Sequence, residues 1–216
     1  MSSMNVAWVL GNGPGLPTDQ LHLLEDEFTV GVNRIYRSGF APKIVMWVDP
    51  MEKVCRDEWP DMRQHMLDNG SIGVSAYGHN KKGQCEYLLN LANPKRNADK
   101  MTDPSYIVCD GTVGIAAIRW CFALGFRSVR TLGISDGDHK HTDPRHFFTR
   151  AGDKGFRNEH TPTQAEVYRK QWLDASAMHP GRIVNAEKEN RKDWPLQGGW
   201  TRDKVVDLLH QKVVSK

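Results

Sequence analysis

The sequence predicts an α/β protein built on a Rossmann-like, doubly wound and mostly parallel β-sheet, with helices on both faces and a long lid-like loop over residues 135–161. Two observations carry this prediction. Short runs rich in β-branched residues recur along the chain, and several are apolar throughout, as strands covered on both faces are. Segments of helical length separate many of these runs, and such alternation is typical of βαβ units.

Seven segments have the composition of strands, and most of them end at a turn signal. The first runs directly into a glycine-rich stretch. In chain order, the predicted strands cover residues 6–10, 28–32, 43–48, 71–74, 106–109, 129–134 and 182–184.

Five segments have helical patterns, over residues 18–25, 50–66, 112–124, 162–178 and 201–214. Thr18 is expected to cap the first helix, and Pro60 to kink or break the second. The third is apolar around most of its surface and is followed by Gly125, which suits the end of a helix. This helix is therefore predicted to lie in the interior, against the sheet.

Two polar segments, residues 92–104 and 135–161, interrupt the alternation. Loops of this length in a compact domain are usually lids or binding loops. The chain has no internal repeat and no low-complexity tract, so one domain is predicted across residues 1–216.

The charge balance and the apolar pattern exclude several classes of protein. In 216 residues, 29 Lys and Arg stand against 26 Asp and Glu, a net charge of +3 that is too small to indicate a nucleic-acid-binding face. No apolar run approaches the ~18 residues of a membrane span, and the first residues lack the pattern of a secretion signal. The four cysteines share no CxxC spacing. These features favour a cytoplasmic protein without a membrane span, and they leave a homo-oligomer open.

Candidate binding residues follow the first predicted strand. Ligands of open α/β sheets bind beyond the carboxyl ends of the strands. There the chain reads Gly11, Asn12, Gly13, Pro14, Gly15, and such a turn lets the backbone approach a phosphate at a helix N-terminus. The stretch matches neither GxGxxG nor a P-loop. A tight strand-to-helix turn without a ligand is the alternative.

Further candidates follow other predicted strands. Asn33 and Asp49 come after the second and third strands, and Gly111 and Thr112 precede the predicted interior helix. An amide or a carboxylate at such a position can contact a base, a ribose or a metal, and a helix N-terminus favours an anion. Each of these residues can also be a simple cap or turn residue.

The predicted loop over residues 135–161 carries the remaining candidates: Ser135, Asp136, Asp138 and His160. Asp136 and Asp138 form an Asp-x-Asp, which can hold Mg²⁺ or Mn²⁺ on a pyrophosphate, although short acidic pairs are common in loops. His160 directly precedes the fourth predicted helix, where an imidazole could accept a proton from an acceptor hydroxyl. A histidine without a chemical role is the alternative.

The tryptophans are mostly at positions expected in the core. Trp194 and Trp200 stand in polar sequence, so of all the tryptophans these two are the best candidates for stacking against a sugar.

Five short motifs together resemble a known group of proteins. They are Val9 to Leu16, Gly31 to Arg34, Val48 to Pro50, Gly111 to Gly114, and Leu132 to Asp136. Their order and spacing resemble the bacterial sialyltransferases that build lipooligosaccharide, and also the flagellar-accessory proteins and the archaeal 6-hydroxymethylpterin pyrophosphokinases.

The resemblance implies a nucleotide bound by Asn12, Gly13, Asn33, Asp49, Gly111 and Thr112, with His160 as the general base. The chain departs from the sialyltransferase pattern at three places. Gly15 stands where those enzymes have Ser, Asp49 where they have Asn, and Ser135 where they have Asp, with the acid shifted to Asp136.

Three functions follow from these features. The first is a nucleotide-sugar-dependent glycosyltransferase with His160 as base, acting on an acceptor that is a glycan, a small molecule or a modified nucleic acid. The second is an ATP- and Mg²⁺-dependent pyrophosphokinase, in which Asp49, Asp136 and Asp138 hold the metal. The third is a non-catalytic accessory protein that binds a nucleotide.

Overall fold

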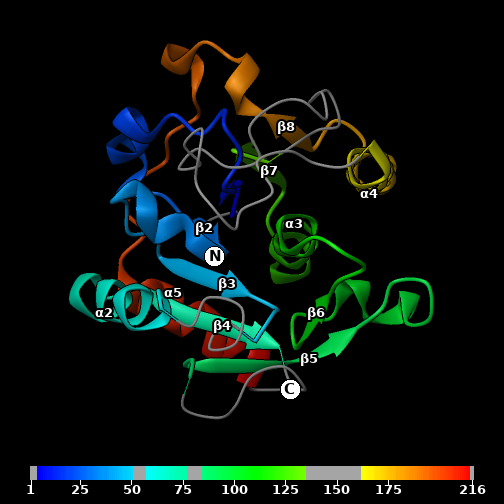
Figure 1. Ribbon diagram of the computed structural model, residues 1–216, viewed down its shortest axis with the longest axis horizontal. Coiled ribbons are helices and arrows are strands. Elements are labelled where there is room, and N and C mark those ends of the chain that lie inside the picture. The colour runs from blue at the N-terminus through cyan, green and yellow to red at the C-terminus, as the bar shows by residue number, and fades with distance from the viewer. Residues whose placement is uncertain (1–3, 51–56, 77–83, 135–161, 215–216) are drawn as a thin grey trace.

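The computed structural model describes residues 4–50, 57–76, 84–134 and 162–214. Over these residues, eight strands form one sheet in the order β6-β5-β4-β3-β2-β1-β7-β8, and every neighbouring pair is parallel (Figure 1). The strands are β1 (Val6–Leu10), β2 (Thr29–Val32), β3 (Ile44–Trp47), β4 (Ile72–Ala76), β5 (Tyr87–Ala92), β6 (Tyr106–Val108), β7 (Ser128–Leu132) and β8 (Ile183–Asn185). The predicted parallel α/β sheet is confirmed.

All seven predicted strands are present, with ends that shift by a few residues, but β5 was missed. Its sequence, Tyr-Leu-Leu-Asn-Leu-Ala, has no β-branched residue, and two of its side chains are exposed. β5 is held instead by its pairing with β4 and β6, which a local pattern does not reveal. The polar segment 92–104 follows β5 directly and shares only Ala92 with it, and a 3₁₀ turn, η3 (Ala98–Thr102), lies within it.

The helical segments also follow the sequence, with three corrections. The helix predicted over residues 50–66 begins at Trp59 instead of Pro50, and residues 51–56 lie outside the described residues. The α-helices are α2 (Trp59–Asn69), α3 (Val113–Leu124), α4 (Pro162–Met178) and α5 (Arg202–Leu209), and the last continues as a π-helical turn, η6 (His210–Val214). Pro60 does not kink α2, because it lies in its first turn, where its missing N–H costs nothing. Thr18 does not cap the first helical segment. This segment is a 3₁₀ helix, η1 (Thr18–Leu24), in which Pro17 holds the cap position.

Apolar side chains cover both faces of the sheet. Along β1, Ala7 and Val9 belong to a buried cluster that includes side chains of α3, α4 and α5. Trp8 and Leu10 point to the other face, into a cluster with η1, α2 and a further 3₁₀ segment, η2 (Asn33–Ser38). Helical segments therefore lie on both faces, as a doubly wound sheet requires (Figure 1).

The strand order creates one point where the direction of winding reverses. From β1 to β6 each strand is added on the same side, and then α3 leads the chain back so that β7 pairs with the other edge of β1. α3 contacts β1, β2, β3, β6 and β7 on its way. In such sheets the crevice beyond the carboxyl ends of the two central strands is the usual ligand site. Here these ends are Leu10 of β1 and Leu132 of β7.

Trp194 and Trp200 both pack against other aromatic rings. The Trp194 side chain is 6% exposed, and its ring lies 4.9 Å from that of Trp8. The Trp200 ring packs edge-on against Phe28 at 5.0 Å. Among the described residues, no helix is long and apolar enough to cross a membrane.

Candidate functional site

The turns that follow β1 and β7 are joined by backbone hydrogen bonds at the reversal point. The Gly11 N–H donates to the carbonyl of Leu132 at 2.7 Å, and the Gly13 N–H donates to the carbonyl of Gly133 at 2.8 Å. Both of these N–H groups were predicted to face a nucleotide. Because each already has a carbonyl partner, a ligand would meet this turn through other groups.

The glycines of these turns are required by the close approach of the two backbones. A Cβ atom on Gly11 would lie 2.1 Å from the carbonyl oxygen of Gly133, and one on Gly13 would lie 2.8 Å from the same atom. Gly133 itself has a left-handed backbone, with φ of +66°. The turn is therefore a tight strand-to-helix turn, as the alternative without a ligand predicts. It also brings Asn12 to the crevice.

Asn12 and Asn33 each have a buried side-chain oxygen at the carboxyl edge of the sheet. Asn12 Nδ2 donates to the carbonyl of Val32 at 2.9 Å, and this contact fixes the orientation of the amide because a carbonyl can only accept. Among the described residues, neither Asn12 Oδ1 nor Asn33 Oδ1 has a hydrogen-bond partner. An unsatisfied buried acceptor costs about 1–3 kcal/mol. A hydroxyl or amino group of a ligand would remove that cost.

Asn33 also has an unusual backbone. Its φ of +49° lies in the left-handed region, and it is the only residue other than glycine in the described chain with a positive φ. Asn tolerates this conformation better than most residues, at a small cost in energy. The backbone therefore places the Asn33 amide at the end of β2, directly beside Val32, which binds Asn12.

The N-terminus of α3 faces the same crevice. The Ile134 side chain, which follows β7, would lie 2.6 Å from a Cβ on Gly11 and 3.3 Å from one on Gly114 in the first turn of α3. One side chain therefore separates the β1 turn from the start of α3. Within the described residues Thr112 makes no side-chain cap, and the N-terminus of a helix attracts anions.

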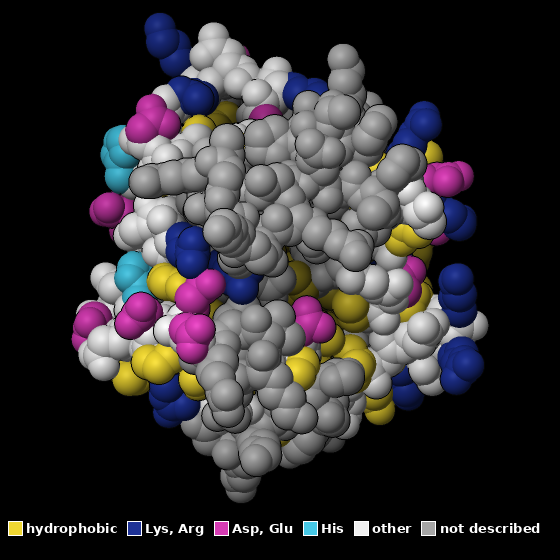
Figure 2. Space-filling view, viewed as in Figure 1, with side chains coloured by type: hydrophobic (Ala, Val, Ile, Leu, Met, Phe, Trp, Pro, Cys, Tyr) yellow, Lys and Arg dark blue, Asp and Glu magenta, His cyan; other side chains and the backbone are white. Residues whose placement is uncertain are grey.

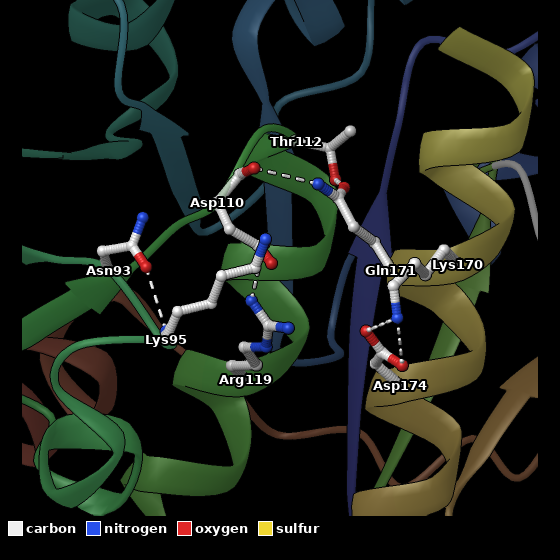
Figure 3. A network of polar contacts seen from close by, with 8 residues as sticks. All are labelled: Asn93, Lys95, Asp110, Thr112, Arg119, Lys170, Gln171 and Asp174. Atoms are coloured by element: carbon white, nitrogen blue, oxygen red, sulfur yellow. Dashed lines mark hydrogen bonds and ion pairs between the residues drawn. The ribbon is translucent and has the colours of Figure 1, made fainter. Parts of the chain in front are cut away.

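Thr112 precedes α3, but its hydroxyl does not cap the helix as expected. It donates instead to Oε1 of Gln171 on α4 at 3.0 Å, while Gln171 Nε2 donates to the carbonyl of Asp110 at 3.0 Å (Figure 3). The carbonyl of Asp110 can only accept, so the amide has one orientation, and the Thr112 proton is committed to Gln171. In this arrangement Thr112 can accept a hydrogen bond from a ligand but cannot donate one to a phosphate.

Gln171 also lies against Gly111. A Cβ on Gly111 would lie 2.5 Å from Gln171 Nε2, and the Gln171 side chain is 5% exposed. The predicted pair Gly111 and Thr112 thus lies beside α4, with Gly111 itself exposed.

A buried ion pair supports the loop before α3. Arg119 Nη1 lies 2.9 Å from Asp110 Oδ1, and the two side chains are 4% and 14% exposed (Figure 3). Asp110 thus contacts α4 through its backbone and α3 through its carboxylate. The pair fixes the loop from which Gly111 and Thr112 extend.

A second charged cluster lies beside Asn33. The Glu58 carboxylate accepts a hydrogen bond from the Tyr36 hydroxyl at 2.8 Å and pairs with Arg34 and Arg37 at 3.3 and 2.9 Å. Burial and the hydrogen bond to Glu58 raise the pKa of Tyr36 to about 12. Burial alone would raise the pKa of Glu58, but the Tyr36 hydroxyl and the two arginines outweigh it and lower this pKa.

The third charged feature is Glu187, in a 3₁₀ turn, η4 (Ala186–Lys188), directly after β8. Glu187 Oε1 accepts the N–H of Gly133 at 2.6 Å. A Cβ on Gly15 would lie 2.0 Å from Glu187 Oε2. The carboxylate therefore lies between the turns after β1 and β7.

Of the remaining predicted residues, only Asp49 lies within the described part of the chain. Asp49 is exposed after β3. Within the described residues, no group of three or more His, Cys, Asp or Glu side chains is arranged to hold a metal ion. Ser135, Asp136, Asp138 and His160 lie outside the described residues. Among the described residues visible in Figure 2, the Lys and Arg side chains are scattered and do not gather over one element.

Three residues of the site were missed by the sequence reasoning: Arg119, Gln171 and Glu187. Arg119 is the one charged residue in the apolar pattern of α3, which is itself a signal of a buried partner. Glu187 follows the last predicted strand and could have been found by inspecting every strand end. Gln171 left no signal in its amphipathic helix.

Comparison with known proteins supports the fold. No protein-family model matches this chain. The sialyltransferase CstII from Campylobacter jejuni, in complex with the substrate analogue CMP-3FNeuAc, is similar over 91% of this chain and 87% of its own, with 13% identity and a TM-score of 0.52. A structure of the same enzyme with a trisaccharide acceptor and CMP covers 91% and 86%, with 12% identity and a TM-score of 0.48. The chain thus has a sialyltransferase-like fold.

Proposed function

We propose that the protein is a nucleotide-sugar-dependent glycosyltransferase. The observation that carries this proposal is the pair of buried amide oxygens, Asn12 Oδ1 and Asn33 Oδ1, beside the reversal point of the sheet. Ligand hydroxyl or amino groups would satisfy both, and the N-terminus of α3 next to them suits a phosphate. The similar sialyltransferase from Campylobacter jejuni binds a CMP-sugar analogue, which makes a CMP sugar the first donor to test.

The proposed reaction is a displacement at the anomeric carbon of the donor. The acceptor oxygen forms a bond to this carbon while the bond from the carbon to the phosphate oxygen breaks, and the nucleotide leaves with the electron pair. The first N–H groups of α3 stabilise the charge that develops on the leaving phosphate. His160, which precedes α4 in the sequence, takes the proton of the acceptor hydroxyl. Asp136 remains a candidate for supporting this step.

The proposal is tested first by binding. CMP, UDP, GDP and ATP are added to the protein with and without Mg²⁺, and thermal unfolding is followed. A nucleotide at about 100 times its Kd should stabilise the native state by about 2.7 kcal/mol and raise the Tm by roughly 5–10 °C. The absence of any shift with every nucleotide would refute a nucleotide site.

Replacing Asn33 by glycine removes the amide and retains the left-handed backbone. Asn33→Gly should therefore unfold within a few degrees of the wild-type protein and lose at least about tenfold in CMP affinity. Asn69→Gly, an exposed Asn at the end of α2, is the matched control and should leave binding unchanged. Equal affinities for Asn33→Gly and the wild type would remove the amide from the site.

The alternatives predict different results in the same experiments. His160→Ala should retain CMP binding and lose turnover of a CMP sugar, whereas a non-catalytic accessory protein shows no turnover before the substitution. A pyrophosphokinase should bind ATP best and lose its activity in a chelator, because Asp49, Asp136 and Asp138 would then hold Mg²⁺. A transferase that releases a monophosphate should remain active in the chelator.

A further inference from the structure

We infer that Glu58 is a positioning residue of the nucleotide site: it fixes the 3₁₀ segment η2 so that Asn33, its first residue, holds its amide at the carboxyl edge of the sheet. This inference rests on the proposed function and adds to it a residue outside the predicted motifs. Glu58 acts through η2 and needs no contact with the nucleotide.

The backbone conformation of η2 is unfavourable on its own. Asn33 has a left-handed backbone, which costs energy for residues other than glycine. Arg34 follows with φ of −84° and ψ of 23°, which interrupts the helical path. Runs of 3₁₀ helix longer than about four residues are uncommon, and η2 spans Asn33–Ser38. Tertiary contacts therefore have to stabilise this segment.

Glu58 belongs to a rigid element that packs against η2. It directly precedes α2, and its carbonyl accepts the N–H of Met62 in the first turn at 3.0 Å. Met62 is 1% exposed and shares a buried cluster with Ile35 of η2. The Glu58 carboxylate is therefore held by a helix whose own packing reaches η2, as a positioning group requires.

The Glu58 carboxylate joins three side chains of η2. Its Oε2 accepts hydrogen bonds from the Tyr36 hydroxyl at 2.8 Å and from Arg37 Nε at 3.0 Å, and it lies 3.3 Å from Arg34 Nε. Oε1 lies 2.9 Å from Arg37 Nη2, so both oxygens bind Arg37. The Glu58 side chain is only 19% exposed, which limits the screening of these contacts by solvent. Because Arg34 directly follows Asn33, the contacts restrict the backbone that carries the Asn33 amide.

The test is a double-mutant cycle on CMP affinity, measured by titration calorimetry. Glu58→Gln removes the charge at nearly unchanged size, so η2 should hold Asn33 in place in fewer molecules. If this fraction falls to about one third, CMP affinity falls about threefold, and a loss of at least this size is expected. In the Asn33→Gly background the amide is absent, so Glu58→Gln should change CMP affinity by less than about twofold. Asp99→Asn, which breaks an exposed ion pair with Lys100, is the matched control and should leave CMP binding unchanged.

The backbone of Asn33 provides a second readout. The NMR chemical shifts of its Cα and Cβ depend on φ and ψ and are followed in the ligand-free protein. In Glu58→Gln these shifts should move away from the values of a left-handed residue, whereas those of Asn12 should stay unchanged. A residue that only adds to the overall stability would leave both sets unchanged in the folded protein. Tyr36→Phe removes one hydrogen bond to Glu58 and keeps the ring, so it should act in the same direction and serves if Glu58→Gln does not fold.

An equal loss of CMP affinity from Glu58→Gln in both backgrounds would overturn the inference, as would an unchanged affinity or unchanged Asn33 shifts. In these cases the wild type still binds CMP, and the proposed function stands. Failure of the wild type to bind any nucleotide would instead refute the proposed function, and the inference with it.

Discussion

Replacing Arg119 by methionine removes one partner of the ion pair beneath the candidate site. Methionine approximates the length and the apolar character of the Arg119 stem, so packing within α3 changes little. The Asp110 carboxylate, 14% exposed, is left without its partner at 2.9 Å. Its charge then remains next to the buried start of α3.

The size of the effect follows from the burial of the pair. Breaking a buried ion pair by removing one member costs about 3–5 kcal/mol, because the other charge stays desolvated. In a protein of this size, 1 kcal/mol corresponds to roughly 2–4 °C in Tm, so Arg119→Met should lower the Tm by roughly 6–20 °C. The exposed pair between Lys170 and Asp174, 71% and 51% exposed, provides the comparison. Lys170→Met should cost less than about 0.5 kcal/mol.

The assay is a double-mutant cycle followed by urea and thermal unfolding. Asp110→Asn combined with Arg119→Met removes both charges, so the double variant should recover most of the stability lost by either single variant. If the cost of Arg119→Met stays below about 1 kcal/mol, or if the two single costs simply add, the pair does not stabilise the loop before Gly111.

Four further outcomes follow from the contacts described. Gly11→Ala should destabilise the protein by more than about 2 kcal/mol in urea unfolding, because the added Cβ would meet the Gly133 backbone. A Cβ added at Gly39 has no atom within 4 Å, so Gly39→Ala should cost only about 1 kcal/mol, from the φ of +76° at that residue. Because the pKa of Glu58 is lowered in the folded protein, ionised Glu58 contributes fully to the free energy of unfolding above its ordinary pKa. This contribution is lost as the pH falls through the pKa that Glu58 has in the folded protein. Glu58→Gln should therefore make the free energy of unfolding depend less on pH in this acid range. The raised pKa of Tyr36 means that stability is retained up to pH 10 and lost between pH 10 and about 12, a loss that Tyr36→Phe should abolish when unfolding is followed by circular dichroism. Gln171→Glu should destabilise the protein and weaken CMP binding, because a carboxylate would face the carbonyl of Asp110. If the free energy of unfolding and the CMP affinity were both unchanged, the assigned orientation of the Gln171 amide would be wrong.

The fold was predictable where local sequence decides the structure. α3 is apolar on nearly every side and ends at Gly125, whose φ of +104° only glycine adopts easily, so both its burial and its end can be read from the residues. The parallel sheet follows from apolar runs that are buried on both faces. β5 was not predictable, because its neighbours in the sheet and not its own residues hold it in place.

The candidate site was predictable only in part. The strand-end rule places Asn12 and Asn33 at one edge, and there the structure brings them together through Val32. The rule does not tell which backbone N–H groups already donate hydrogen bonds within the protein. Gly11 and Gly13 look like phosphate ligands in the sequence, but their N–H groups donate to the last residue of β7 and to the glycine after it, more than 100 residues away along the chain. Thr112 similarly resembles a cap, and its partner Gln171 is 59 residues away.

Charge is unevenly distributed along the carboxyl edge of the sheet. The Glu187 carboxylate is fixed at the β8 end, the N-terminus of α3 lies across the reversal point, and the buried amide oxygens of Asn12 and Asn33 flank the same crevice. In the proposed nucleotide site, a phosphate is therefore favoured beside α3, because the β8 end would place it against the Glu187 carboxylate. Gly15 is therefore best understood through its distant partner Glu187, and a serine at this position is compatible with the fold only if that carboxylate moves.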